Sequence, residues 1–162
     1  MKNRNLLILA LVGVVLIGAG LLWIARPGPS DEDLVRRAIR DVAEGARAGD
    51  LAATLKPISD SYAGEDGWTK DELRGFLWRE FKRRGTLSIV LSEIEVEVTG
   101  DAASAWFYAA IADGLDLGAF DLVPSDAEAF HFQVSLARED GGWHITGADY
   151  ERYSTGSPGF GR

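Results

Sequence analysis

Asp149 is the residue that the sequence places best for acid–base chemistry. It follows the turn at Asp140-Gly141, about which the two flanking segments pair as an antiparallel hairpin. This pairing predicts that Asp149 lies opposite Phe132, on the sheet face that Ile145 shares. A carboxylate among apolar side chains has a raised pKa and can act as a general base. The alternative is that Asp149 lies where the strand ends, and is there solvated or caps a helix.

The opposite face of this predicted sheet carries side chains suited to binding a partner. The same pairing places His131 opposite Tyr150, and the preceding hairpin brings Trp106 and Tyr108 to this outer face. Aromatic residues surrounded by polar ones are typical of protein interfaces. We therefore expect a protein partner, or a second copy of the chain as a homodimer, to bind here. The alternative is that these rings only stabilise an exposed sheet by pairing across strands.

The chain offers few groups that could hold a metal or act as a nucleophile. It has no cysteine, which excludes disulfides, thiolate nucleophiles and cysteine metal sites. Its two histidines, His131 and His144, are 13 residues apart and do not form a helical metal pair. The four aspartates between residues 113 and 126 lack the spacing of a calcium-binding loop, so we predict a solvated acidic loop there. We expect no metal and no cofactor.

Acidic residues dominate the composition, with 25 Asp and Glu against 17 Lys and Arg. Three of the basic residues, Lys2, Arg4 and Arg26, lie beside the amino-terminal segment, so the rest of the chain is more acidic still. A surface of this charge repels nucleic acid and anionic lipid. A basic cluster between Arg79 and Arg84 ends a predicted helix, where positive charge complements the helix dipole. We therefore expect no nucleic-acid partner.

Leu6 to Ala25 is a run of twenty residues without charge or proline. As a helix this run is about 30 Å long, which is the thickness of the hydrocarbon part of a bilayer. Trp23 lies near one end, where indoles prefer the membrane interface. We predict a transmembrane helix over residues 6–25 that anchors the chain. The alternative is a signal peptide cleaved near Gly18-Ala19-Gly20.

Charges on either side of this run predict its orientation. Lys2 and Arg4 precede it, whereas acidic residues 31–33 follow it. Because positive residues stay on the cytoplasmic side, residues 1–5 are predicted to be cytoplasmic, in a single-pass protein of the inner or plasma membrane. A short linker over 26–30 leads to a periplasmic or extracellular domain over 31–152. The glycine-rich residues 153–162 are predicted to be a disordered tail.

Hydrophobic periodicity predicts three helices at the start of this domain. The first extends over residues 31–49 and the second, shorter one over 51–57, where a proline stops it. Thr69 and Glu72 have the spacing of a capping box, so they begin a third helix. Gly85 ends that helix.

From Leu87 onward the apolar residues recur with a period of two, which is typical of strands. The alternation changes phase near Ser92 or Glu93, so one residue there is extra, as in a β-bulge. Turns at Gly100 and at Asp140-Gly141 predict two hairpins separated by a long loop. Three helices followed by about four to five strands predict an α+β domain, with the helices packed on a curved antiparallel sheet.

Three segments carry a resemblance to a known family. They are ARAGDLAATL at the end of the first helix, VEVTGDAASAWF across the first hairpin and EDGGWHITGADY at the last one. In this order they resemble the nuclear transport factor 2-like superfamily, which includes the SnoaL-like polyketide cyclases and the ketosteroid isomerases. The resemblance covers residues 31–152. It implies a cone-shaped domain whose sheet wraps around the long helix, with a pocket at the wide end for a small apolar ligand.

The same resemblance would place Tyr62 at the mouth of that pocket. A phenol there could donate a hydrogen bond to a carbonyl oxygen of a ligand. The alternative is that Tyr62 packs with its hydroxyl in water. The sequence departs from the isomerases, because it has no matching set of tyrosine and aspartate residues that can be transferred position by position.

Two functions remain open at this point. The first is a membrane-anchored, extracytoplasmic interaction module that binds a protein partner or itself without catalysis. The second is a small-molecule-binding protein, or an enzyme of the isomerase, cyclase or hydratase kind, with Asp149 and Tyr62 in an apolar pocket. The second function requires a deep cavity, whereas the first does not.

Overall fold

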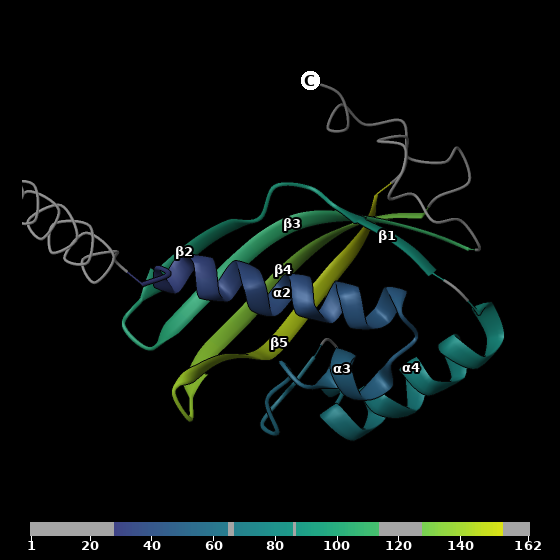
Figure 1. Cartoon of the computed structure of the whole chain (residues 1–162), viewed down its shortest axis with the longest axis horizontal. Helices are drawn as coiled ribbons and strands as arrows, with labels where there is room; N and C mark the ends of the chain where they lie inside the picture. Colours follow the sequence, from purple (N-terminus) through teal and green to yellow (C-terminus); the bar gives the residue numbers. More distant parts are fainter. Residues whose placement is uncertain (1–27, 65–66, 86, 114–127, 154–162) are drawn as a thin grey trace, which may run out of the picture. The chain divides into compact units, whose positions relative to one another are not determined.

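The computed structural model describes residues 28–64, 67–85, 87–113 and 128–153, in which three helices precede five strands (Figure 1). The helices are α2 (Asp31–Arg47), α3 (Leu51–Leu55) and α4 (Lys70–Arg84). The strands are β1 (Leu87–Leu91), β2 (Glu95–Thr99), β3 (Ala102–Asp113), β4 (Glu128–Glu139) and β5 (Gly142–Tyr153). This order confirms the predicted α+β class.

The predicted membrane anchor lies outside the described residues. So do most of the long loop before β4 and the tail from residue 154 onward. None of the three described helices is long and apolar enough to cross a membrane. The anchor at residues 6–25 therefore stays a prediction.

The helices begin and end where local chemistry predicts. Asp50 caps α3 by accepting a hydrogen bond from the backbone of Ala53. At α4 the Thr69 hydroxyl accepts from the backbone of Glu72, and the Glu72 carboxylate accepts from the backbone of Thr69, so the predicted capping box is present. Gly85 ends α4 with a φ of 74°, a conformation that glycine adopts without strain.

The sheet is antiparallel, with the strand order β1-β3-β4-β5, and β2 also pairs with β3. Leu91 pairs with Ala109, whereas Glu95 pairs with Trp106, so three residues of one chain segment lie opposite two of the other. This irregularity confirms the extra residue predicted near Ser92. It keeps Ile89 and Leu91 of β1 on the same sheet face as Val96 and Val98 of β2.

A second irregularity in the last hairpin contradicts the predicted pairing. Asp140 and Gly141 have φ values of 50° and 79° and form the predicted turn. The register then shifts between Ser135 and Leu136, which leaves one extra residue in β5. Beyond this bulge every side chain of β5 points to the face opposite to the one predicted.

The core lies between α2 and the sheet, whose strands α2 crosses (Figure 1). Val35 and Ala105 are fully buried there. Two arginines of α2 fasten it to the sheet: Arg36 Nε donates to the carbonyl of Ile94 at 3.1 Å, and Arg47 Nε donates to that of Ile89 at 2.7 Å. These bonds hold α2 against β1 and against the short segment between β1 and β2.

Candidate functional site

A cavity of about 640 Å³ lies between the helices and the sheet. All three helices contribute to its wall, together with β1, β3, β4 and β5. Most of the lining side chains are aliphatic or aromatic. The polar side chains that line it are Thr54, Tyr62, Glu80, Arg83, Arg84, Glu128, Tyr150 and Arg152. The cavity is thus large, mainly apolar and charged at one end.

Aromatic rings from three neighbouring strands form the sheet side of the cavity. Phe107 of β3 stacks on Phe132 of β4, with ring centroids 5.4 Å apart. Phe132 in turn lies 5.9 Å from Tyr150 of β5, and Phe130 meets Tyr150 edge to face at the same distance. Such ring pairs hold one another in place. They line the cavity and do not fill it.

Helix α4 forms the opposite wall, and none of its residues is buried. Leu73, Leu77 and Phe81 line the cavity and are only half-buried. Near the middle of the helix Phe76 lies 5.5 Å from Trp68, in an edge-to-face contact at which both rings remain partly exposed. The apolar face of α4 therefore borders the cavity, and only Leu73 and Leu77 also pack against the core.

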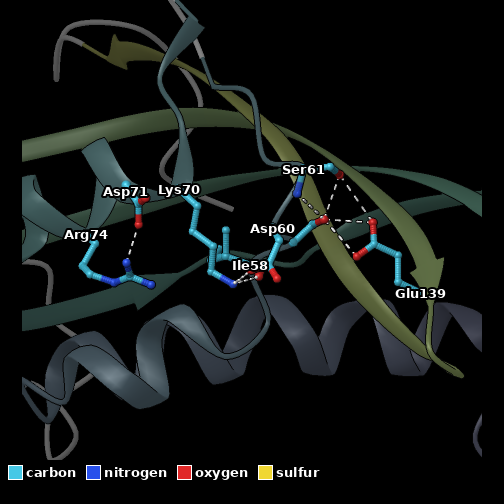
Figure 2. A network of polar contacts seen from close by, with 8 residues as sticks. Ile58, Asp60, Ser61, Lys70, Asp71, Arg74 and Glu139 are labelled. Carbon is cyan, nitrogen blue, oxygen red and sulfur yellow. Dashed lines mark hydrogen bonds and ion pairs between the residues drawn. The ribbon is translucent and has the colours of Figure 1, made fainter.

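Polar contacts fasten the N-terminal end of α4 (Figure 2). Lys70 Nζ donates to the carbonyl of Ile58 at 2.6 Å and to the carboxylate of Asp60 at 2.8 Å. The segment that accepts these bonds is itself held, because the buried Ser59 hydroxyl donates to the carboxylate of Glu139 at 2.8 Å. This chain of contacts joins α4 to the turn between β4 and β5.

Arg84 fastens the C-terminal end of α4 to the sheet. Its guanidinium lies 2.9 Å from Glu80, 3.1 Å from Asp113 at the end of β3 and 3.6 Å from Glu128 at the start of β4. Hydrogen bonds from Arg83 and then Arg84 lower the pKa of Glu80. Glu80 is therefore ionised at neutral pH and is a weak base.

Tyr62 lines the cavity, as the resemblance implied. Burial raises the pKa of its phenol, and the nearby charges of Asp149 and Tyr150 raise it further. A Cβ atom on Gly64 would lie only 2.6 Å from the Tyr62 hydroxyl oxygen, so glycine at this position makes room for the phenol. Tyr62 is thus protonated at neutral pH and can donate a hydrogen bond.

The predicted position of Asp149 in the pocket is wrong. The bulge places it opposite Gln133, exposed on the outer face of the sheet, and not opposite Phe132. Tyr150 takes the place opposite Phe132 and lines the cavity. Asp149 and Tyr62 therefore do not form an acid–base pair inside the cavity.

The outer face keeps three of its four predicted binding residues. Tyr108 and His131 pair across β3 and β4 with ring centroids 4.8 Å apart, and Trp106 is half-buried beside them. Tyr150, predicted for this face, lies on the cavity side, and Glu151 takes its place opposite His131. Binding of a partner through the outer face stays a prediction. Among the described residues no three metal-ligating side chains come together.

The sequence matches no protein-family model and no curated protein. The fold, in contrast, is similar to solved structures. A suggested dehydratase of the NTF2-like family from Streptomyces avermitilis superposes with a TM-score of 0.63 at 16% identity, over 76% of this chain and 96% of that one. An NTF2-like protein with a cystatin-like fold from Novosphingobium aromaticivorans gives 0.60 at 18% identity, over 88% and 90% of the two chains. The domain has the NTF2-like fold.

The match to a longer protein is partial. Bd1075 from Bdellovibrio bacteriovorus superposes with a TM-score of 0.62 at 7% identity, and the chain spans 40% of its length. At these identities the comparisons show the fold alone.

The aromatic lining of this cavity was not predicted from the sequence. Phe130 and Phe132 alternate in β4, which predicts a shared face but not whether that face meets a core or a cavity. The apolar residues of α4 recur with helical spacing, which likewise does not distinguish a core from a cavity.

Proposed function

We propose that the domain binds a small apolar molecule in the cavity between α4 and the sheet. The observation that carries this proposal is the size of the cavity together with its lining. Small-molecule sites are typically about 300–1,000 Å³, mainly apolar and equipped with a few polar groups. The volume of about 640 Å³ lies within that range. Tyr62 supplies a hydrogen-bond donor that can orient a ligand.

The volume of the cavity excludes a sealed and dry interior. Empty closed cavities cost about 24 cal/mol per Å³, so a volume of about 640 Å³ would cost on the order of 15 kcal/mol if it were sealed and dry. That cost equals the whole stability of an ordinary domain, about 5–15 kcal/mol. The cavity is therefore open to water or filled by a ligand. Partly exposed Trp68, Phe76 and Tyr150 in its wall are consistent with an opening through which a ligand passes.

The geometry favours binding over acid–base catalysis. The carboxylates that line the cavity, Glu80 and Glu128, are both paired with arginines. The hydrogen bonds to Glu80 lower its pKa, which makes Glu80 a weak base. Asp149 lies on the other face of the sheet. A suggested dehydratase shares this fold, but at 16% identity the likeness extends to the fold and not to a reaction. The binder thus has stronger support than the enzyme or the interaction module.

The proposed binding domain would also lie next to a membrane. The uncharged run from Leu6 to Ala25 would anchor the domain to a membrane, and its flanking charges would place the domain outside the cytoplasm. An apolar ligand held in such a domain would be shielded from water beside the membrane. A single cysteine introduced into the domain, and its accessibility to a membrane-impermeant reagent in whole cells, would test this topology; a cysteine that does not react would contradict it.

The experiment is native mass spectrometry of the full chain with fatty acids of increasing length, a sterol and a polycyclic aromatic hydrocarbon. Ala148 lines the cavity, so Ala148→Phe should occupy part of it and weaken binding by about tenfold or more. Gln133→Phe is the matched control, because it adds the same ring on the exposed outer face. If no compound binds the unmodified chain, or if Ala148→Phe binds as well as Gln133→Phe, the proposal is wrong.

A further inference from the structure

The side of α4 that faces away from the cavity concentrates positive charge on an acidic protein. The helix contains six basic and three acidic residues, whereas the whole chain has a net charge of −8. All three acidic residues are already engaged. Asp71 pairs with Arg74, Glu72 caps the helix at Thr69, and Glu80 binds Arg83 and Arg84. Arg83 and Arg84 line the cavity, and Lys70 is bonded to the segment before α4. The side facing away from the cavity therefore carries three positive charges, those of Arg74, Arg79 and Lys82, against the one negative charge of Asp71.

Two cations and an indole form the centre of this surface. Arg79 and Lys82 are exposed, and none of the ion pairs found among the described residues involves either of them. Trp78 is 55% exposed, the highest value among the large apolar side chains of the described residues. The Lys82 ammonium lies 5.9 Å from the centre of the Trp78 ring. We call Arg74, Gly75, Trp78, Arg79 and Lys82 the outer face of α4.

We propose that the outer face of α4 docks on an anionic lipid surface. Lysine and arginine bind anionic headgroups, and tryptophan prefers the boundary between headgroups and acyl chains. The acidic remainder of the domain does not prevent this contact, because charges are screened beyond about 8 Å in physiological salt. Only the charges nearest the lipid act strongly, and on this face three are positive, whereas the one negative charge, that of Asp71, is paired with Arg74.

The dimensions of the outer face favour lipid over an acidic protein. A helix of 15 residues is about 22 Å long, and one face of it is about 10 Å wide, which gives on the order of 220 Å². A stable protein interface buries about 800 Å² on each partner. A bilayer needs no such area, because several cations and one inserted indole bind it additively. The opposite side of α4 lines the cavity, so docking would bring the cavity wall next to lipid.

The test uses the absence of cysteine in the chain, which allows a single reporter to be placed. Gly75→Cys puts the label on the outer face of α4, where an added Cβ lies no closer than 3.6 Å to another group. Glu97→Cys puts the same label on β2 as a reference. The full chain, carrying a nitrobenzoxadiazole dye at one site, is reconstituted in phosphatidylcholine vesicles with and without phosphatidylglycerol.

We expect the emission of the label at position 75 to shift to the blue only with phosphatidylglycerol, and to return when salt is raised. The label at position 97 should not respond. Arg79→Glu combined with Lys82→Glu should reduce the docked fraction by about tenfold or more. Arg37→Glu combined with Arg40→Glu is the matched control, because both residues are exposed on α2 and the change in net charge is equal.

Each other outcome would overturn the proposal. A label at position 75 that does not respond to phosphatidylglycerol would show that the outer face does not dock on lipid and would favour an acidic protein. An equal loss in both double variants would show that net charge, and not this face, controls the response. These outcomes leave ligand binding in the cavity untouched, so the two proposals fail separately.

Discussion

Replacing Gly45 by alanine should destabilise the domain, although alanine is the better helix former. An added Cβ would lie 2.5 Å from the backbone nitrogen of Thr54 and 2.9 Å from the backbone of Ala53, so α3 must move. Such overpacking costs about 1–3 kcal/mol. The shift also disturbs the hydrogen bond of 2.7 Å from the Thr54 hydroxyl to the carbonyl of Asp50, worth about 1 kcal/mol. The higher helix propensity of alanine offsets about 1 kcal/mol of this cost, so the free energy of unfolding should fall by about 1–3 kcal/mol.

Gly75→Ala is the matched control for this prediction. It makes the same change in α4, where the nearest group to the added Cβ is the flexible end of Arg79 at 3.6 Å. Only the propensity gain remains, so this variant should be more stable by up to about 1 kcal/mol. Urea unfolding followed by tryptophan fluorescence would measure both. If Gly45→Ala is at least as stable as the unmodified chain, α2 and α3 do not approach each other as closely as the structure shows.

Three further predictions follow from the polar contacts. Thr69→Ala removes the cap of α4 and should lower the free energy of unfolding by about 1 kcal/mol, with faster amide hydrogen exchange in the first turn of that helix. The pKa of Asp31 is lowered by hydrogen bonds from Arg138 and Trp143, so its stabilisation is present at neutral pH and is lost as pH falls below about 4. Asp31→Asn should therefore lose less stability on acidification, as thermal unfolding at several pH values would show. The raised pKa of Tyr62 means that its phenol ionises only above about pH 10, and the folded state loses stability there. Tyr62→Phe should remove a tyrosine that titrates above about pH 10 from the near-ultraviolet absorbance, and an unchanged titration curve would contradict this.

The helices and the first hairpin could be predicted from the sequence because their signals are local. The capping box at Thr69 depends on residues three positions apart. The extra residue near Ser92 could be found because apolar side chains mark both phases of the alternation, with Leu91 on one side and Ile94 on the other. Such elements require no knowledge of what packs against them.

The position of Asp149 was not predicted, because the bulge in β5 lies beside a contact that pairing about the turn does not reveal. Gly147 lies where a Cβ would be 3.0 Å from the carbonyl oxygen of Ala63, a contact between residues far apart in the chain. A weak local sign existed, since Ile145 and Ala148 fall on opposite phases. The cavity was still harder to predict, because its volume depends on how far α4 stands from the sheet. Spacing within a helix does not report that distance.

Residues 57–63 cover an edge of the sheet at which other molecules could otherwise bind. β5 is the last strand of the sheet, and its unpaired edge could add a strand from another molecule. The backbone of residues 57–63 lies along this edge and bonds to it at three places, with Ile145 donating to Pro57 at 2.8 Å and accepting from Ser59 at 2.9 Å, and Thr146 accepting from Ala63 at 2.9 Å. The hydrogen bond from Ser59 to Glu139 holds the segment there. Breaking it, for example by Glu139→Ala, should loosen the segment and leave the edge of β5 open to other molecules, so we expect more aggregation of this variant at high concentration.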